Sequence, residues 1–136
     1  MPRGGRRTED RPGRHPPVLV ADSYDGVRRA CARYLGHFYF QVAEATNGEE
    51  ALGLIGGTLP RVILTESTLP MMPAPRLTQW LAQSWRTRDI PVIVLTQESE
   101  AGGLSRRAGH VLVKPFTLSD MLQEVRRVLR TVTTSP

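Results

Sequence analysis

Five short apolar runs, each followed by a polar or helix-like segment, constrain the fold of this chain more than any other feature. The runs occupy residues 18–21, 39–45, 61–66, 91–96 and 111–113. Runs of this length that are rich in Val, Ile and Leu are typical of strands buried on both faces of a parallel sheet. Strands that alternate with helices predict the α/β class, with a doubly wound five-stranded parallel sheet and helices on both of its faces.

The segments between the runs carry apolar residues at helical spacing. Helices are predicted over residues 25–36, 48–57, 77–85 and 118–129, and a polar helix or loop over residues 97–109. Asn47 is expected to cap the second helix, and Gly56 and Gly57 are expected to end it. Trp80 and Trp85 in the third helix are expected to pack against the core and its rim.

A single domain over residues 17–131 is predicted, because 136 residues, of which 40% are hydrophobic, can bury one core. Residues 1–16 are rich in Arg, Pro and Gly and are predicted to form a disordered tail, and residues 132–136 a short C-terminal tail. Residues 1–17 hold three of the five net positive charges. The remainder of the chain is therefore not basic enough to predict a nucleic-acid-binding surface.

Several classes of protein are disfavoured by features that the sequence lacks. There is no run of about 18 apolar residues and no apolar segment of a secretion signal, so a cytoplasmic protein without a membrane span is expected. The lone Cys31 lies on an apolar helical face and is expected to be a buried structural thiol. His15, His37 and His110 lack ligand spacing, and no nucleotide-binding or nucleophile motif is present. An enzyme is therefore not expected.

Four polar residues stand where predicted strands end: Asp22, Glu66, Thr96 and Lys114. Because the carboxyl ends of parallel strands meet at one edge of the sheet, these side chains are expected to form one polar cluster in the crevice where such sheets bind ligands. Lys114 is the only lysine beside 17 arginines. A compact ammonium suits a small oxygen cluster in a tight pocket better than a guanidinium does.

The chain resembles the receiver domain of two-component response regulators over roughly residues 17–131. The matching stretches are VLVAD at 18–22, NGEEAL at 47–52, PRVIL at 60–64, LPMM at 69–72, IPVIVLT at 90–96 and VKPF at 113–116. The resemblance implies a flavodoxin-like (βα)5 fold, Mg²⁺ held by an acidic pair, and an aspartate that accepts phosphate from a histidine kinase. It also implies that Thr96 and Lys114 read the phosphoryl oxygens and that the Lys114–Pro115 bond is cis.

The departures from the family pattern bear most on function. Glu66 stands where the family has its phosphate-accepting aspartate, and Ser23 stands where the second acid of the metal pair belongs. Val111 replaces an aromatic residue that often moves between states, which removes the family's usual readout of the active conformation. The segment between Thr96 and Lys114 is also a few residues shorter than is usual.

These departures predict weak or absent Mg²⁺ binding and the loss of phosphotransfer. Mg²⁺ needs oxygen ligands in near-octahedral geometry, and Asp22 has lost its acidic neighbour. The carboxylate of Glu66 is displaced by roughly 1.5 Å relative to an aspartate, and a misplacement of about 1 Å can cost about a hundredfold in rate. Glu66 is expected to pair with Lys114, with Thr96 as a hydroxyl donor. The resulting hypothesis is a stand-alone pseudo-receiver, fixed in one conformation, that acts as a protein-binding module.

Two alternatives remain open at this point. Glu66 could still accept phosphate, or Asp22 could replace it, which would make the chain a switchable Mg²⁺-dependent receiver. Alternatively, the arginine-rich tail could bind nucleic acid, with the domain as a dimeriser, and this binding would depend steeply on salt.

A partner surface is expected on the face that family members commonly use for pairing, at about residues 98–131. Arginines gather there on the last helix and in the segment that precedes the fifth strand: Arg106, Arg107, Arg126, Arg127 and Arg130. A basic face of this kind fits an acidic signalling partner or a second copy of the chain. A simple solvated helical face is the alternative interpretation.

Overall fold

The computed structural model describes residues 15–97 and 110–134. Its elements follow in the order β1 (His15–Ala21), α2 (Asp25–His37), β2 (Phe40–Ala45), α3 (Gly48–Thr58), β3 (Val62–Glu66), α4 (Ala74–Leu81), β4 (Val92–Gln97), β5 (Val111–Lys114) and α6 (Leu118–Thr134). Most of the predicted arginine-rich tail, the predicted polar segment before β5, and Arg106 and Arg107 lie outside the described residues.

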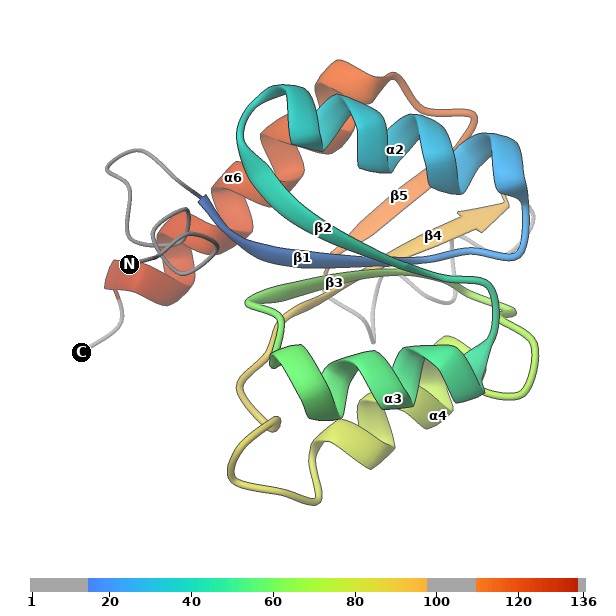
Figure 1. The fold of residues 1–136 in the computed structure, drawn as a ribbon, viewed down its shortest axis with the longest axis vertical. Coiled ribbons are helices and arrows are strands. Elements are labelled where there is room, and N and C mark those ends of the chain that lie inside the picture. The colour runs from blue at the N-terminus through green and yellow to red at the C-terminus, as the bar shows by residue number, and fades with distance from the viewer. Residues whose placement is uncertain (1–14, 98–109, 135–136) are drawn as a thin grey trace, which may run out of the picture.

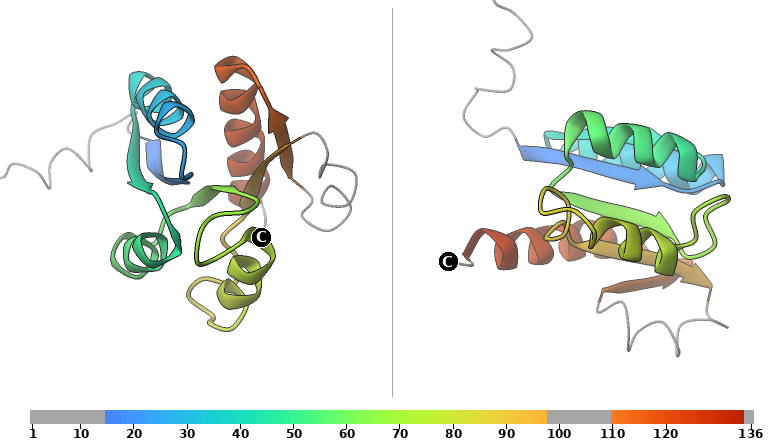
Figure 2. Two further views of the ribbon diagram at one scale, coloured as in Figure 1. Left: turned by 90° about the vertical axis from the view of Figure 1, so that its right-hand side faces the viewer. Right: turned by 90° about the horizontal axis from the view of Figure 1, so that it is seen from below.

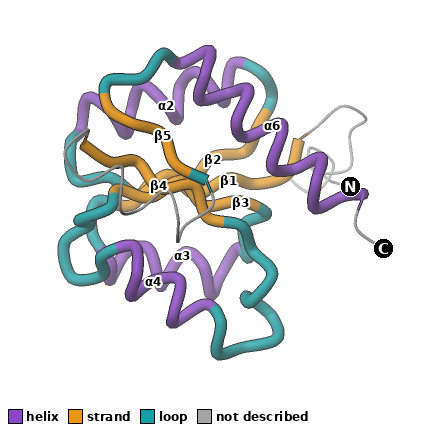
Figure 3. Tube along the Cα trace, turned by 180° about the vertical axis from the view of Figure 1, so that it is seen from behind, coloured by secondary structure: helices purple, strands orange, loops and turns teal. Residues whose placement is uncertain are grey.

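The strands form one five-stranded parallel sheet in the order β2-β1-β3-β4-β5, which confirms the predicted α/β fold. Figure 2 shows the strands running in a common direction, so that their carboxyl ends lie along one edge of the sheet. Helices cover both faces (Figure 1): α2 and α6 lie on one side, and α3 and α4 on the other. The view from behind shows the same two layers of helices around the strands (Figure 3).

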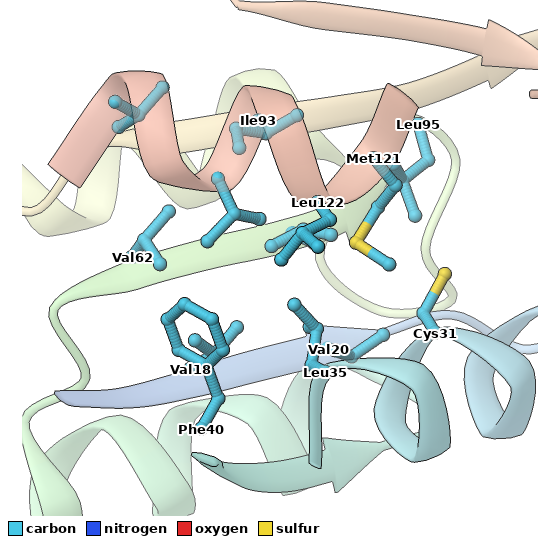
Figure 4. Packing of buried hydrophobic residues seen from close by; sticks show 13 residues of the cluster. Val18, Val20, Cys31, Leu35, Phe40, Val62, Ile93, Leu95, Met121 and Leu122 are labelled. Carbon is cyan, nitrogen blue, oxygen red and sulfur yellow. The ribbon is translucent and has the colours of Figure 1, made fainter. Parts of the chain in front are cut away.

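Each face of the sheet carries its own apolar core. On the α2 and α6 side, Cys31, Leu35 and Met121 pack against valines and leucines of β1, β3 and β4 (Figure 4). On the other side, Ile55 of α3 and Leu77 of α4 pack against alternate residues of the same strands. Burial on both faces explains why the strands read as continuous apolar runs rather than as alternating patterns. The predicted burial of Cys31 is confirmed, since its side chain is inaccessible to solvent.

Several predicted boundaries were wrong by a few residues. Strand β1 begins at His15, inside the segment predicted as a tail, and α6 continues to Thr134, into the predicted C-terminal tail. Asn47 caps α3 as predicted, because its side chain accepts a hydrogen bond from the Glu50 N–H. Gly56 and Gly57 do not end this helix; Leu59 adopts the left-handed conformation that terminates it, with φ of 47°.

The predicted packing role of the two tryptophans was also wrong. Helix α4 ends at Leu81, so Trp85 lies beyond it and is 77% exposed, and Trp80 is 37% exposed. The buried face of α4 consists instead of Ala74, Leu77 and Leu81. None of the helices within residues 15–97 and 110–134 combines the length and the apolar character that crossing a membrane requires.

Candidate functional site

The strand register brings the predicted polar residues to one edge of the sheet. Glu66 is the last residue of β3 and pairs with Leu95 of β4, next to Thr96. Lys114 is the last residue of β5 and pairs with Gln97. Asp22 follows β1 directly, and its backbone N–H donates to the carbonyl of Ala45 at the end of β2. Asp22, Glu66 and Thr96 are all buried. The expectation of a polar cluster at the carboxyl ends of the strands is thus confirmed.

Lys114 forms an ion pair with Asp22. Its Nζ lies 2.8 Å from Oδ2 of Asp22, and the two side chains are 10% and 0% exposed, respectively. Within residues 15–97 and 110–134, neither atom has a further hydrogen-bond partner, so each depends on the other for its stabilisation. The second oxygen of Asp22, Oδ1, accepts a hydrogen bond from the Tyr24 N–H at 2.9 Å.

Glu66 does not pair with Lys114, which corrects the expectation from the sequence. Its Oε1 accepts two hydrogen bonds from Ser23, one from the backbone N–H and one from Oγ, each at 2.9 Å. The longer side chain of a glutamate reaches the loop after β1, where Ser23 offers both donors. Ser23 stands where receiver domains have a metal-binding acid. In this chain it is instead the hydrogen-bond donor to the carboxylate of Glu66.

The aromatic ring of Tyr24 covers the ammonium group of Lys114. The ring centroid lies 5.0 Å from Nζ, within the range of a cation–π contact. Tyr24 is 59% exposed and occupies the N-cap position of α2, where its side chain makes no capping hydrogen bond. The role of Tyr24 was not predictable, because nothing in the local pattern shows that a tyrosine two residues after Asp22 contacts the end of the distant strand β5.

Arg28 stabilises the loop that carries Asp22. It too was absent from the site residues predicted from the sequence. Its Nη1 donates to the carbonyl oxygen of Asp22 at 3.1 Å, and its guanidinium pairs with Asp25 and Glu44. Burial opposes the charge of Arg28, but hydrogen bonds and charge interactions with the two acids outweigh it and raise the pKa of the guanidinium. The spacing of Arg28 from Asp25 was a usable signal, whereas Glu44 comes from β2 and could not have been assigned.

The loop that follows Glu66 packs closely on the start of α3. The backbone N–H of Gly48 donates to the carbonyl of Pro70 at 2.7 Å. A Cβ atom at Gly48 would lie 2.3 Å from Cβ of Met72, so only glycine permits this approach. Within the same loop, Met71 has a φ of 74° and is exposed. This contact fixes the path of the chain after Glu66.

The remaining predicted site residues lie around this cluster. Thr96 is buried, and its Oγ1 donates to the Gln97 carbonyl at 3.3 Å. Val111 is half-buried in β5 and packs against the core on the α3 and α4 side. The Lys114–Pro115 bond is cis, as the resemblance implies.

The oxygen ligands at this edge do not fit Mg²⁺ in the way that the resemblance implies. Asp22 uses Oδ2 for Lys114 and Oδ1 for a backbone N–H, while Oε1 of Glu66 is bound by both donors of Ser23. Ser23 contributes a neutral hydroxyl, a weaker ligand for Mg²⁺ than the carboxylate that the resemblance implies at this position. Among the residues that the structure describes, no three His, Cys, Asp or Glu side chains come together to hold a metal ion.

Comparison with known proteins identifies the class of this fold and site. The response regulator receiver domain matches residues 18–126. Response regulator MprA of Mycolicibacterium vanbaalenii is 30% identical over 120 residues, which cover 85% of this chain and 51% of that protein. The transcriptional regulatory protein SrrA of Staphylococcus aureus is 31% identical over 117 residues, 83% of this chain and 47% of that protein. The chemotaxis response regulator CheY4 of Vibrio cholerae superposes with a TM-score of 0.75 at 25% identity, covering 83% of this chain and 98% of that one.

The chain therefore belongs to the response regulator receiver family of two-component signalling. It spans about half the length of the curated relatives that it matches. Their remaining halves have no counterpart in these alignments.

Proposed function

We propose that this protein is an atypical receiver that signals through protein contacts without being phosphorylated. The observation that carries the proposal is the pairing inside the acidic pocket, the site formed by Asp22, Ser23, Glu66 and Lys114. Glu66 is held by both donors of Ser23, and Lys114 is neutralised by Asp22. Each charged group that would serve phosphotransfer in the family therefore has a partner within the protein. Such buried pairs can fix one conformation, and that is the role assigned to them in this chain.

Phosphotransfer is disfavoured for two physical reasons. The acceptor carboxylate must approach phosphorus in line, at about 3–3.5 Å, and a glutamate turned toward Ser23 is not positioned for this attack. The phosphoryl group also needs its charge balanced, and Ser23 cannot replace a metal-binding carboxylate. A weak or absent response to Mg²⁺ is part of the proposal. A cytoplasmic location fits a signalling module of this kind.

Intact mass measurement tests this proposal against the competing one of a phosphorylatable receiver. The full chain is incubated with Mg²⁺ and acetyl phosphate, and the unphosphorylated mass is expected to persist. A gain of one phosphoryl group that disappears in Glu66→Gln would instead establish Glu66 as an acceptor. A gain that disappears only in Asp22→Asn would identify Asp22.

The proposed contact surface is the exposed side of α6, formed by Arg126, Arg127 and Arg130. Arg127 is bound by Glu124 and approaches Nδ1 of His110 at 3.2 Å. The guanidinium of Arg126 lies 5.3 Å from the ring of Phe38. These contacts hold two of the arginines in place, so that a partner would lose less side-chain entropy on binding them. An acidic signalling protein or a second copy of the chain would fit this surface.

Charge reversal tests this surface. The double variant Arg126→Glu/Arg127→Glu is compared with Arg61→Glu/Arg76→Glu, which changes two exposed arginines elsewhere. If a second copy is the partner, sedimentation analysis of the full chain shows self-association that only the first variant abolishes. A wild-type chain that stays monomeric would exclude the homodimer and leave a different signalling protein as the partner.

A further inference from the structure

Tyr24 lies over the buried ion pair of Lys114 and Asp22. Nζ of Lys114 and Oδ2 of Asp22 are both inaccessible to solvent, although the site lies at the rim of the sheet. The ring of Tyr24 lies 5.0 Å from Nζ and is itself largely exposed on its outer side. One face of the ring therefore meets the ammonium group while the other side meets water.

Among residues 15–97 and 110–134, no hydrogen bond or core contact is seen for the side chain of Tyr24 besides its contact with Lys114. It makes no capping hydrogen bond to α2, and Tyr24 is absent from both apolar cores. Its backbone N–H, by contrast, binds Oδ1 of Asp22 at 2.9 Å. A substitution at this position would keep the backbone contact and remove only the ring. The ring and the backbone can therefore be tested separately.

We propose that Tyr24 is a positioning residue whose ring covers the ammonium group of Lys114 and holds it against Asp22. An ammonium over the face of an aromatic ring is attracted by its quadrupole, and this attraction grows when water is excluded. Exclusion of water also strengthens the pairing of Nζ with Asp22. On the Tyr24 side of the site, the ring lies between Nζ of Lys114 and solvent. This role rests on the proposed function and deepens it, because a Lys114 that is held against Asp22 is less available to external oxygen ligands.

The single lysine of the chain makes this assignment measurable. Competitive labelling with acetic anhydride, followed by peptide mapping, reports the accessibility of one side-chain amine, separated from the amino terminus. Removal of the ring in Tyr24→Ala is expected to raise the labelling rate of Lys114 by about 2- to 30-fold, the range to which cation–π contacts correspond. Tyr24→Phe keeps the ring and is expected to label like the wild type.

A spectroscopic signature separates a positioning role from a general loosening of the fold. In protein labelled with ¹³C-lysine, the ε-methylene of Lys114 gives one signal, which the nearby ring is expected to shift upfield. This shift should persist in Tyr24→Phe and disappear in Tyr24→Leu. Tyr39→Ala removes another exposed tyrosine and serves as the matched control, with no change expected in either measurement.

Two results would overturn the assignment. One is a Lys114 labelling rate in Tyr24→Ala equal to that of the wild type. The other is an ε-methylene shift that is the same in Tyr24→Leu and Tyr24→Phe. Both measurements use unphosphorylated protein without a phosphodonor. A negative result for Tyr24 therefore leaves the question of phosphorylation open. Conversely, a chain that accepts phosphate but shows both expected effects would overturn the proposed function alone.

Discussion

Nζ of Lys114 lies 2.8 Å from Oδ2 of Asp22, although β5 and β1 are not neighbours in the sheet. Strands β3 and β4 lie between them in the order β2-β1-β3-β4-β5. The ion pair therefore joins the carboxyl ends of two distant strands above the sheet. Glu66, at the end of an intervening strand, turns instead to Ser23 in the loop after β1.

Removal of the ammonium is expected to destabilise the protein strongly. Lys114→Met leaves the buried carboxylate of Asp22 without its counter-charge, and breaking a buried pair in this way costs about 3–5 kcal/mol. Urea unfolding measures the loss. The double variant Asp22→Asn/Lys114→Met removes both charges and should recover most of this stability. Equal losses in the single and double variants would show that the charge of Asp22 is not what Lys114 compensates.

Restoring an aspartate at positions 23 and 66 is expected to create a Mg²⁺ site. Ser23→Asp/Glu66→Asp places carboxylates close together, where their repulsion should lower the melting temperature in the absence of metal. Mg²⁺ binds only the folded form and should raise the melting temperature of the acidic variant again. The wild type is expected to respond at most weakly. Ser23→Asn/Glu66→Asp has a similar shape with one charge fewer and is the control; an equal response of the control and the acidic variant would contradict this explanation.

The order of the elements and the location of the site were predictable because both follow from local patterns. Continuous apolar runs indicated buried parallel strands, and polar residues at their ends had to meet at one edge. The partners within the site were not predictable. Whether Glu66 meets Lys114 or Ser23 depends on side-chain directions over a few ångströms, which residue spacing does not determine.

Other errors came from tertiary contacts that override local preference. Gly56 and Gly57 favoured a helix end, yet α3 continues to Thr58 and Leu59 adopts the strained left-handed conformation. Trp80 fitted the helical period of Leu77 and Leu81, but it remains partly exposed. Tyr24 and Arg28 gained their roles from contacts with Lys114 of β5 and Glu44 of β2.

Two glycines of α3 are expected to respond to alanine in opposite directions. A Cβ at Gly48 would come within 2.3 Å of Cβ and 2.9 Å of N of Met72, so Gly48→Ala should overpack the loop after Glu66. Overpacking of this kind typically costs about 1–3 kcal/mol. Gly53 has no atom within 4 Å of the same position, and Gly53→Ala should stabilise the helix by roughly 0.5–1 kcal/mol. Urea unfolding of both variants measures the two changes in the free energy of unfolding. Equal changes in Gly48→Ala and Gly53→Ala would contradict the prediction.

The stability of the protein is expected to fall at alkaline pH because of Cys31. Burial and, to a smaller extent, the negative charge of Asp22 raise the pKa of its thiol from 9.0 to about 11, against the opposing effect of Lys114. Between these values the folded protein keeps the proton that the unfolded chain has released. The free energy of unfolding therefore decreases as pH rises from about 9 to about 11, by about 2–3 kcal/mol in total.

Cys31→Ala removes the thiol and isolates this effect, since every other side chain is the same in both proteins. Urea unfolding is measured for both between about pH 8 and pH 11, and the difference between the two free energies is plotted against pH. The wild type should lose its advantage over the variant progressively above about pH 9. A difference that stays constant up to pH 11 would mean that the thiol ionises as readily in the folded protein as in the unfolded chain, in conflict with its burial against Leu35 and Met121.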